Sequence, residues 1–226
     1  MVANRGRQRR CALTLAIVVL VAAIQACSSG EAPWESNLPL VLINTNGVRI
    51  PDDPRIPATM RIIWDRSGDL NYPESRHINF HGRIGIELRG AVSQTFPKKQ
   101  YRFEIWGNDN NDIPARVLDL PADSDWILYG PYSDKSLMRN FLAYELSNRM
   151  GRDAVSPRFV EVVLHDSGQE DLLKTSVGVD LLMETIQPGY NRLDIDPLGP
   201  WENREPSISG SYVLKIDRVS AGDVYF

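Results

Sequence analysis

Cysteine is nearly absent from this 226-residue sequence, and its two cysteines, Cys11 and Cys27, both lie close to the N-terminus. The rest of the chain therefore has no cysteine pair for a disulfide bond and no thiolate metal site. The serine-elbow, Walker and HExxH motifs are also missing. The sequence thus gives no support to a serine hydrolase, a P-loop NTPase or a zinc metalloprotease, and the stability of the fold must come from an apolar core.

An excess of basic residues is lacking as well. The chain has 25 Lys and Arg residues against 29 Asp and Glu residues, which gives a formal net charge of −4. Removing residues 1–26 would delete four arginines and no acidic residue, leaving 21 basic residues and a net charge of −8. Proteins that bind nucleic acids carry a basic footprint. We therefore expect no nucleic-acid partner.

The N-terminal residues have the pattern of an export signal. Four arginines precede an apolar run at 12–24 that is too short to span a bilayer comfortably. The run ends at Ala26-Cys27, which resembles the lipobox of bacterial lipoproteins, in which the cysteine is acylated. We therefore expect a lipoprotein signal peptide at 1–26, a lipid on Cys27, a polar tether at 27–37, and an exported cell-envelope protein held at a membrane. A plain secretory signal and an uncleaved single-pass anchor are the alternatives.

From residue 38 onward, apolar runs bounded by turn residues predict strands. These strands are expected at 38–45, 59–65, 84–88, 101–106, 126–129, 158–164, 177–183 and 212–216. The third should pair antiparallel with the fourth, and the sixth with the seventh. Since no βαβ alternation is present, the predicted fold is α+β, with a mostly antiparallel sheet and one principal helix. One domain is expected over residues 38–226.

The principal helix is predicted to begin at Ser133 or Asp134, whose side chains can cap its N-terminus, and to end at Gly151, which suits a left-handed C-cap. Its apolar residues recur at three- and four-residue spacing, in the columns Leu137, Phe141, Tyr144 and Met138, Leu142, Leu146. That spacing predicts a wide apolar face packed on the sheet.

Basic residues gather in the predicted first turn of this helix, where Lys135 and Arg139 would lie on one face beside free backbone N–H groups. Such a turn can hold an anion. A second basic group, Arg89, Lys98, Lys99 and Arg102, stands in and beside the short connection between the third and fourth strands. The alternative is that all of them are solvated surface cations.

No metal site is predicted. The Asp and Asn residues of loop 107–114 could suit calcium, but the Gly and the bidentate Glu of a calcium loop are absent, and such clusters commonly turn the chain. His77 and His81 lack a third ligand. Glu184 and Asp217, which lie in or beside strands, are expected to be partners of Lys or Arg, because buried carboxylates are usually paired.

Four segments together resemble the N-terminal portion of the CotH family, the spore-coat-type atypical protein kinases. They are IELRGAVSQTFPKKQYRFEI, LPADSDWILYGPYSDKSLMRNFLAYELSNRMG, PRFVEVVL with VGVDLLMETI, and SYVLKIDR. The resemblance implies part of an atypical kinase fold and, where the family activity is complete, ATP with Mg or Mn. Our candidates for nucleotide-phosphate binding are Arg89, Lys98, Lys99, Lys135, Arg139 and Lys215.

The chain also departs from the family pattern. Ala91-Val92-Ser93 stands where the family has Asn-Ser-Ser, and Thr185 stands where it often has lysine. The family's metal-binding and catalytic Asp and Asn motifs lie beyond the strand that corresponds to 212–217. We therefore expect a truncated or inactive kinase-like domain that binds at most a nucleotide or another anion, transfers no phosphate by itself and has no catalytic residue to name. The alternative is a non-catalytic surface or coat-assembly module with a protein partner.

Overall fold

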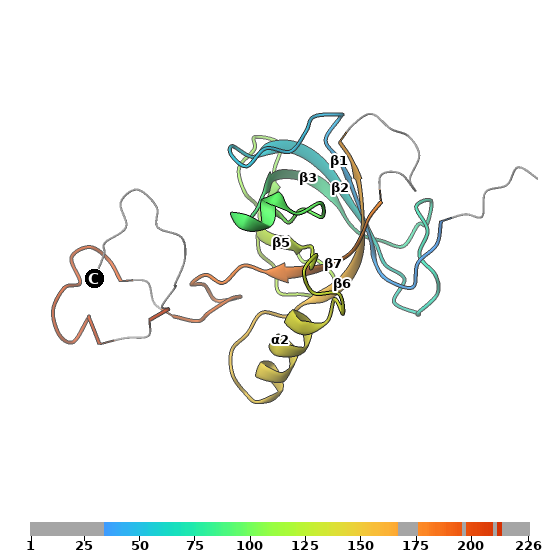
Figure 1. Ribbon diagram of the computed structural model, residues 1–226. Coiled ribbons are helices and arrows are strands. Elements are labelled where there is room, and N and C mark those ends of the chain that lie inside the picture. Colours follow the sequence, from blue (N-terminus) through green and yellow to red (C-terminus); the bar gives the residue numbers. More distant parts are fainter. Residues whose placement is uncertain (1–33, 167–175, 196–197, 210–211, 214–226) are drawn as a thin grey trace, which may run out of the picture. The chain divides into compact units, whose positions relative to one another are not determined.

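The computed structural model (Figure 1) describes residues 34–166, 176–195, 198–209 and 212–213. The chain divides into two compact units, Met1–Glu35 and Ser36–Phe226, and the helices and strands described here belong to the second. In chain order these are β1 (Leu40–Asn44), β2 (Ile56–Ile63), β3 (Ile78–Leu88), the 3-10 helix η1 (Val92–Thr95), β4 (Tyr101–Trp106), β5 (Asp125–Tyr129), α2 (Arg139–Arg149), β6 (Arg158–His165) and β7 (Ser176–Glu184).

The strands of the described residues form a closed barrel in the order β1-β2-β3-β4-β5-β7-β6. Neighbouring strands are antiparallel except at the closing pair, where β1 runs parallel to β6 from Leu40↔Glu161 to Asn44↔His165. The predicted α+β fold with one principal helix is therefore wrong: among these residues a seven-strand barrel dominates and the one α-helix is short. The reason is that closure joins segments far apart in sequence, for which local patterns carry no signal.

Most of the predicted strands are confirmed. Strand β4 occupies the predicted residues, and the antiparallel pairs β3–β4 and β6–β7 are both present. Strand β3 begins six residues before the predicted start at Ile84, because His81, Gly82 and Arg83 interrupt the apolar alternation of its first half. The predicted strand at 212–216 is not seen at 212–213, which have no regular structure, and 214–216 lie outside the described residues.

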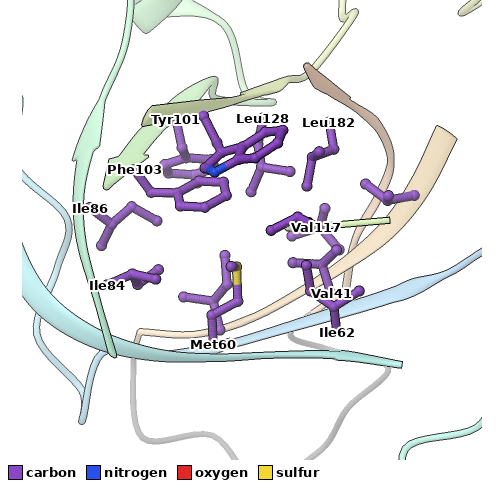
Figure 2. Packing of buried hydrophobic residues seen from close by; sticks show 14 of the residues in the cluster. Val41, Met60, Ile62, Ile84, Ile86, Tyr101, Phe103, Val117, Leu128 and Leu182 are labelled. Carbon is purple, nitrogen blue, oxygen red and sulfur yellow. The ribbon is translucent and has the colours of Figure 1, made fainter. Parts of the chain in front are cut away.

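The core fills the inside of the barrel (Figure 2), where Met60, Phe103 and Leu182 converge from three different strands. Alternation along each strand explains this arrangement, since every second side chain points to the same face. Ile84 and Ile86 of β3 are fully buried there, as the sequence pattern predicted. This interior, and not a cover of helices, stabilises the domain.

The helix α2 begins at Arg139, five residues after Asp134 and six after Ser133, the two predicted starts. Leu137 has a left-handed backbone with φ of 59°, which breaks the helical path just before this point. Asp134 still has a capping role, because its Oδ2 atom accepts a hydrogen bond of 2.9 Å from the Arg139 N–H. The predicted C-terminal signal is confirmed, since Gly151 has φ of 72° and Arg152 N donates to Ser147 O at 3.0 Å.

Only part of the predicted apolar face of α2 packs on the barrel, and that part is half-buried. Phe141 and Tyr144 pack on a small cluster outside the barrel that includes Leu181 of β7, and the rings of Phe141 and Phe159 stack at 4.7 Å. The second column, Met138, Leu142 and Leu146, is exposed. No helix among the described residues has the length and hydropathy needed to cross a bilayer.

Candidate anion-binding site

The basic loop, residues 89–99, connects β3 to β4 and is held in shape by its own lysine. Lys99 Nζ donates hydrogen bonds of 2.7 Å to the carbonyl oxygens of Gln94 and Phe96, at the end of η1. Gly90 allows the sharp bend before η1, because it has φ of 97° and an added Cβ would lie 2.0 Å from Ser93 Oγ. Lys99 is therefore a structural residue of the loop, which limits its use for a ligand.

The side chain of Lys98, from the same loop, extends to the barrel. Its Nζ atom lies 2.7 Å from Asp180 Oδ1 on β7 and also donates to the carbonyl oxygen of Val179. Asp180 is completely buried. It faces the barrel interior, because Leu182, two residues later, belongs to the interior cluster while Leu181 belongs to the cluster outside the barrel.

Burial dominates the electrostatics of this pair. It raises the pKa of Asp180 to about 6, although the charge and hydrogen bond of Lys98 act in the opposite direction. Burial also raises the pKa of Tyr101, and the charges of Asp166 and Asp180 add to that effect. Lys98 thus neutralises a carboxylate in an apolar interior, so its charge is already in use.

The turn at 130–138 meets the basic loop. Gly130 has no room for a side chain, because an added Cβ would lie 2.5 Å from Lys99 O and 3.0 Å from Lys98 Cε. The ring centroids of Phe96 and Tyr132 are 5.2 Å apart. Lys135 Nζ lies 4.0 Å from the Tyr132 ring centroid and donates to Tyr132 O at 2.7 Å. Loop and turn therefore form one junction that carries three of the candidate lysines.

Two candidate arginines stand at the rim of this junction. Arg139 is exposed and lies 3.6 Å from Asp134 Oδ1. Arg89 is exposed and donates to Gln100 Oε1 at 3.3 Å. Burial raises the pKa of Tyr129; the nearby charge of Asp134 adds to this effect and that of Arg89 opposes it. Arg139 thus lies beside the turn, whereas Arg89 lies at the start of the basic loop against Gln100.

One part of the predicted site is wrong. Lys135 and Arg139 do not share a helix face, because Lys135 precedes the helix and the left-handed Leu137 lies between them. Two other predicted residues, Lys215 and Cys27, lie outside the described residues. Asp180 was missed by sequence reasoning, although a carboxylate in the apolar run VGVDLLM was a usable signal.

A second charged cluster fixes the segment that follows β7. Arg192, whose side chain is 3% exposed, lies 3.1 Å from Glu184 Oε1 and 3.2 Å from Asp123 Oδ2. Its guanidinium carbon lies 4.8 Å from the Trp126 ring centroid. The expected pairing of Glu184 is confirmed, while Asp217 lies outside the described residues. A cavity of about 570 Å³ opens beside this cluster and is also lined by Tyr144 of α2.

Several of the residues considered for metals take part in local contacts. In loop 107–114, Gly107 N donates to Asn111 O at 2.8 Å and Asn110 has φ of 61°, so the loop is a turn. His77 Nδ1 lies 3.2 Å from Asp65 Oδ2. Across the described ranges, no three His, Cys, Asp or Glu residues are grouped so that they could hold a metal ion.

Comparison with known protein families gives a match over much of the chain. The family model described as CotH kinase protein matches residues 86–218, which is more than half of the chain. The matched region includes the basic loop, the turn at 130–138, α2 and β7. No curated protein matches the sequence.

Proposed function

The chain belongs to the CotH kinase family, and on that premise we propose that its domain binds the phosphate groups of a nucleotide at the junction of the basic loop and the turn at 130–138. The observation that carries this proposal is the contact between loop and turn at Gly130 and Tyr132. It gathers cations in a chain that is acidic as a whole.

The candidate residues take different roles in this proposal. Lys98 and Lys99 shape the junction, because their ammonium groups are engaged by Asp180 and by loop carbonyls. The exposed Arg89, Lys135 and Arg139 contact the phosphates. Each keeps unused N–H donors, since a lysine has three and an arginine five. Phosphate oxygens are the acceptors that such groups bind most strongly.

The expected affinity is low. Exposed cations gain little from a single contact, because water screens them. Three charge-assisted contacts of about 1.5–2 kcal/mol each, about 4.5–6 kcal/mol together, correspond to a Kd on the order of 0.04–0.5 mM. ATP with Mg or Mn is the ligand that the family implies, but the described residues offer no group of carboxylates or imidazoles for the ion. We therefore propose binding of the nucleotide and derive no step of phosphoryl transfer.

Calorimetry with ATP tests the proposal on the full chain purified in detergent. Lys135→Ala with Arg139→Ala should weaken binding at least tenfold, and raising the salt concentration should weaken binding to the parent chain. Arg116→Ala is the matched control, because Arg116 is exposed and lies beyond the opposite end of β4. Equal binding by the parent chain and the double variant would show that these residues are only solvated cations.

The alternative is a non-catalytic surface or coat-assembly module, and the exposed apolar residues of α2 favour it. In that case the junction would bind any polyanion without preference for a nucleoside. Competition between ATP and inorganic polyphosphate separates the two functions. Displacement of ATP by polyphosphate at equal phosphate concentration supports the module, whereas retention of ATP supports nucleotide binding.

We also propose that the protein is exported and held at a membrane by a lipid on Cys27. The supporting pattern is the order of arginines, apolar run and Ala26-Cys27. Mass spectrometry of the mature N-terminus tests this, with a diacylated Cys27 as the expected result. Cys27→Ser should abolish the processing. An unmodified N-terminus, or cleavage at another bond, would contradict the proposal.

A further inference from the structure

The contacts between the basic loop and its surroundings lie mostly near the surface. The 3-10 helix η1 of this loop has no buried residue. Gln94 donates a hydrogen bond to Asp52 at an exposed position, and the ring of Phe96 lies 5.2 Å from that of the exposed Tyr132. A segment with so little apolar burial opens easily, because few apolar contacts are lost when it moves.

The pair of Lys98 and Asp180 is different, because it connects the loop to the barrel interior. The lysine side chain is 17% exposed and the aspartate side chain is not exposed at all. Two glycines lie along the lysine: an added Cβ would lie 3.0 Å from Lys98 Cε at Gly130 and 3.8 Å from Lys98 Nζ at Gly178. A lysine stem is flexible and its ammonium group is strongly hydrated. Water therefore competes with Asp180 for this ammonium group.

The negative charge of Asp180 is what keeps Lys98 in the interior. Its second oxygen, Oδ2, is buried and accepts no hydrogen bond from the described residues. The neighbouring strands β5 and β6 face it with apolar residues of the interior cluster. Tyr101 of β4, whose raised pKa keeps the phenol neutral, and Asp166, which follows β6, are the other ionisable groups here. Protonation of Asp180 would thus leave Lys98 without its counterion.

We propose that Lys98 and Asp180 form a proton-sensitive latch, in which the charged carboxylate holds the basic loop on the barrel and protonation of the carboxylate lets Lys98 turn to solvent and the loop open. The driving force is the hydration of the ammonium group, because a cation enclosed without a counterion is costly. Since burial raises the pKa of Asp180 to about 6, the loop should be closed in neutral solution and open in mildly acidic solution.

The latch would also regulate the proposed nucleotide site, and in that role it rests on the proposed function. Arg89 and Lys99 lie in the same loop as Lys98, whereas Lys135 lies on the turn at 130–138. Opening the loop would separate these cations, so the site would be assembled only while Asp180 is charged. The movement of the loop itself does not depend on any ligand.

Hydrogen exchange followed by mass spectrometry tests the latch on the full chain in detergent, with no ligand present. The protection factor of residues 89–99 is compared at each pH with that of loop 107–114, at the opposite end of β4. From pH 8 to pH 5, protection of 89–99 should fall at least about fivefold, while that of 107–114 stays within about twofold. Asp180→Asn should show the low protection of 89–99 at both pH values.

Asp166→Asn is the matched control, because it removes the other carboxylate that acts on this interior, and it should keep the pH-dependent change. Equal protection of 89–99 at pH 8 and pH 5 in the parent chain would overturn the latch. A change that persists in Asp180→Asn, or is lost in Asp166→Asn, would assign the titration to another group and overturn it as well.

A second variant and a second measurement keep the outcomes separate. If Asp180→Asn does not fold, Asp180→Ser takes its place, because it also removes the charge, and the same low protection is expected. Since the exchange experiment contains no nucleotide, failure of the latch leaves the nucleotide proposal intact. Failure of ATP to bind in calorimetry would overturn the nucleotide site and leave the loop movement as measured.

Discussion

Lys98 and Asp180 lie 2.7 Å apart, Nζ to Oδ1, and join the basic loop to the inner side of β7. The carboxylate is completely buried, while the lysine side chain is 17% exposed. A buried ion pair contributes little net stability, because both ions lose their hydration, but removing one partner leaves an uncompensated charge. The pair therefore fixes where the basic loop sits and makes that position sensitive to either residue.

The first prediction concerns the loss of the cation. Lys98→Met should lower the free energy of unfolding at pH 8 by about 3–5 kcal/mol, because Asp180 is left charged and buried. Urea unfolding followed by tryptophan fluorescence measures the change. Lys98→Met with Asp180→Leu should recover most of the loss, since no buried charge remains. If the double variant is as unstable as the single one, the pair is not the cause.

The second prediction is a pH dependence. Folding raises the pKa of Asp180 from its ordinary value of 3.8 to about 6, so the folded state binds more protons than the unfolded state between these values. The contribution of Asp180 to stability therefore falls as the pH rises from about 4 to about 6. The loss is on the order of 3 kcal/mol. Asp180→Asn should flatten this part of the stability curve, whereas identical curves for the two proteins would contradict the assignment.

The third prediction tests the junction of the basic loop and the turn at 130–138. Gly130→Ala places a Cβ 2.5 Å from Lys99 O, a backbone atom that cannot give way easily. We expect a loss of about 1–3 kcal/mol in stability and weaker nucleotide binding. Gly151→Ala is the control, because nothing lies within 4 Å of its added Cβ. Its left-handed backbone should cost about 1 kcal/mol without any effect on binding.

The fourth prediction concerns Arg192. Arg192→Met leaves the carboxylates of Asp123 and Glu184 without their shared cation and should lower stability by about 3 kcal/mol. The segment 187–193 should then be cut faster by a protease. Arg192→Lys should give an intermediate loss, because a lysine cannot span two carboxylates as a guanidinium does. Arg149→Met, which breaks an exposed pair, is the control and should change stability by less than about 0.5 kcal/mol. If Arg149→Met lowers stability as much as Arg192→Met, burial is not the cause of the effect at Arg192.

The sequence predicted the strands well because each one carries its own alternating pattern. Ile84 and Ile86 indicated one face of β3, and Phe103 and Ile105 one face of β4. All four side chains are in the core. The contact between β1 and β6 that closes the barrel could not be predicted from such local patterns. There, Thr45 N donates a hydrogen bond of 3.1 Å to His165 O, 120 positions later in the chain. Nothing local distinguishes a strand that will close a barrel from one that ends a sheet.

The positions of the candidate basic residues could be predicted only in part. Lys98 and Lys99 are neighbours in the short connection between β3 and β4, whereas only the structure brings the turn that carries Lys135 to the same junction. The roles of the first two could not be predicted, because Lys98 pairs with a residue on β7 and Lys99 with its own loop. The start of α2 depends on one left-handed residue, Leu137, and leucine gives no sign of that conformation.

The parallel pairing of β1 with β6 has a consequence for how the chain comes to be folded. The first strand finds its second neighbour only after β6 has been made, and β7 must still insert between β5 and β6. Contacts of such long sequence separation form slowly, because the closure entropy of a long loop precedes any gain. Barrel closure is therefore expected to be the late and slow step of folding. Until β6 and β7 are both in place, the outer edge of β1 has unpaired backbone N–H and C=O groups.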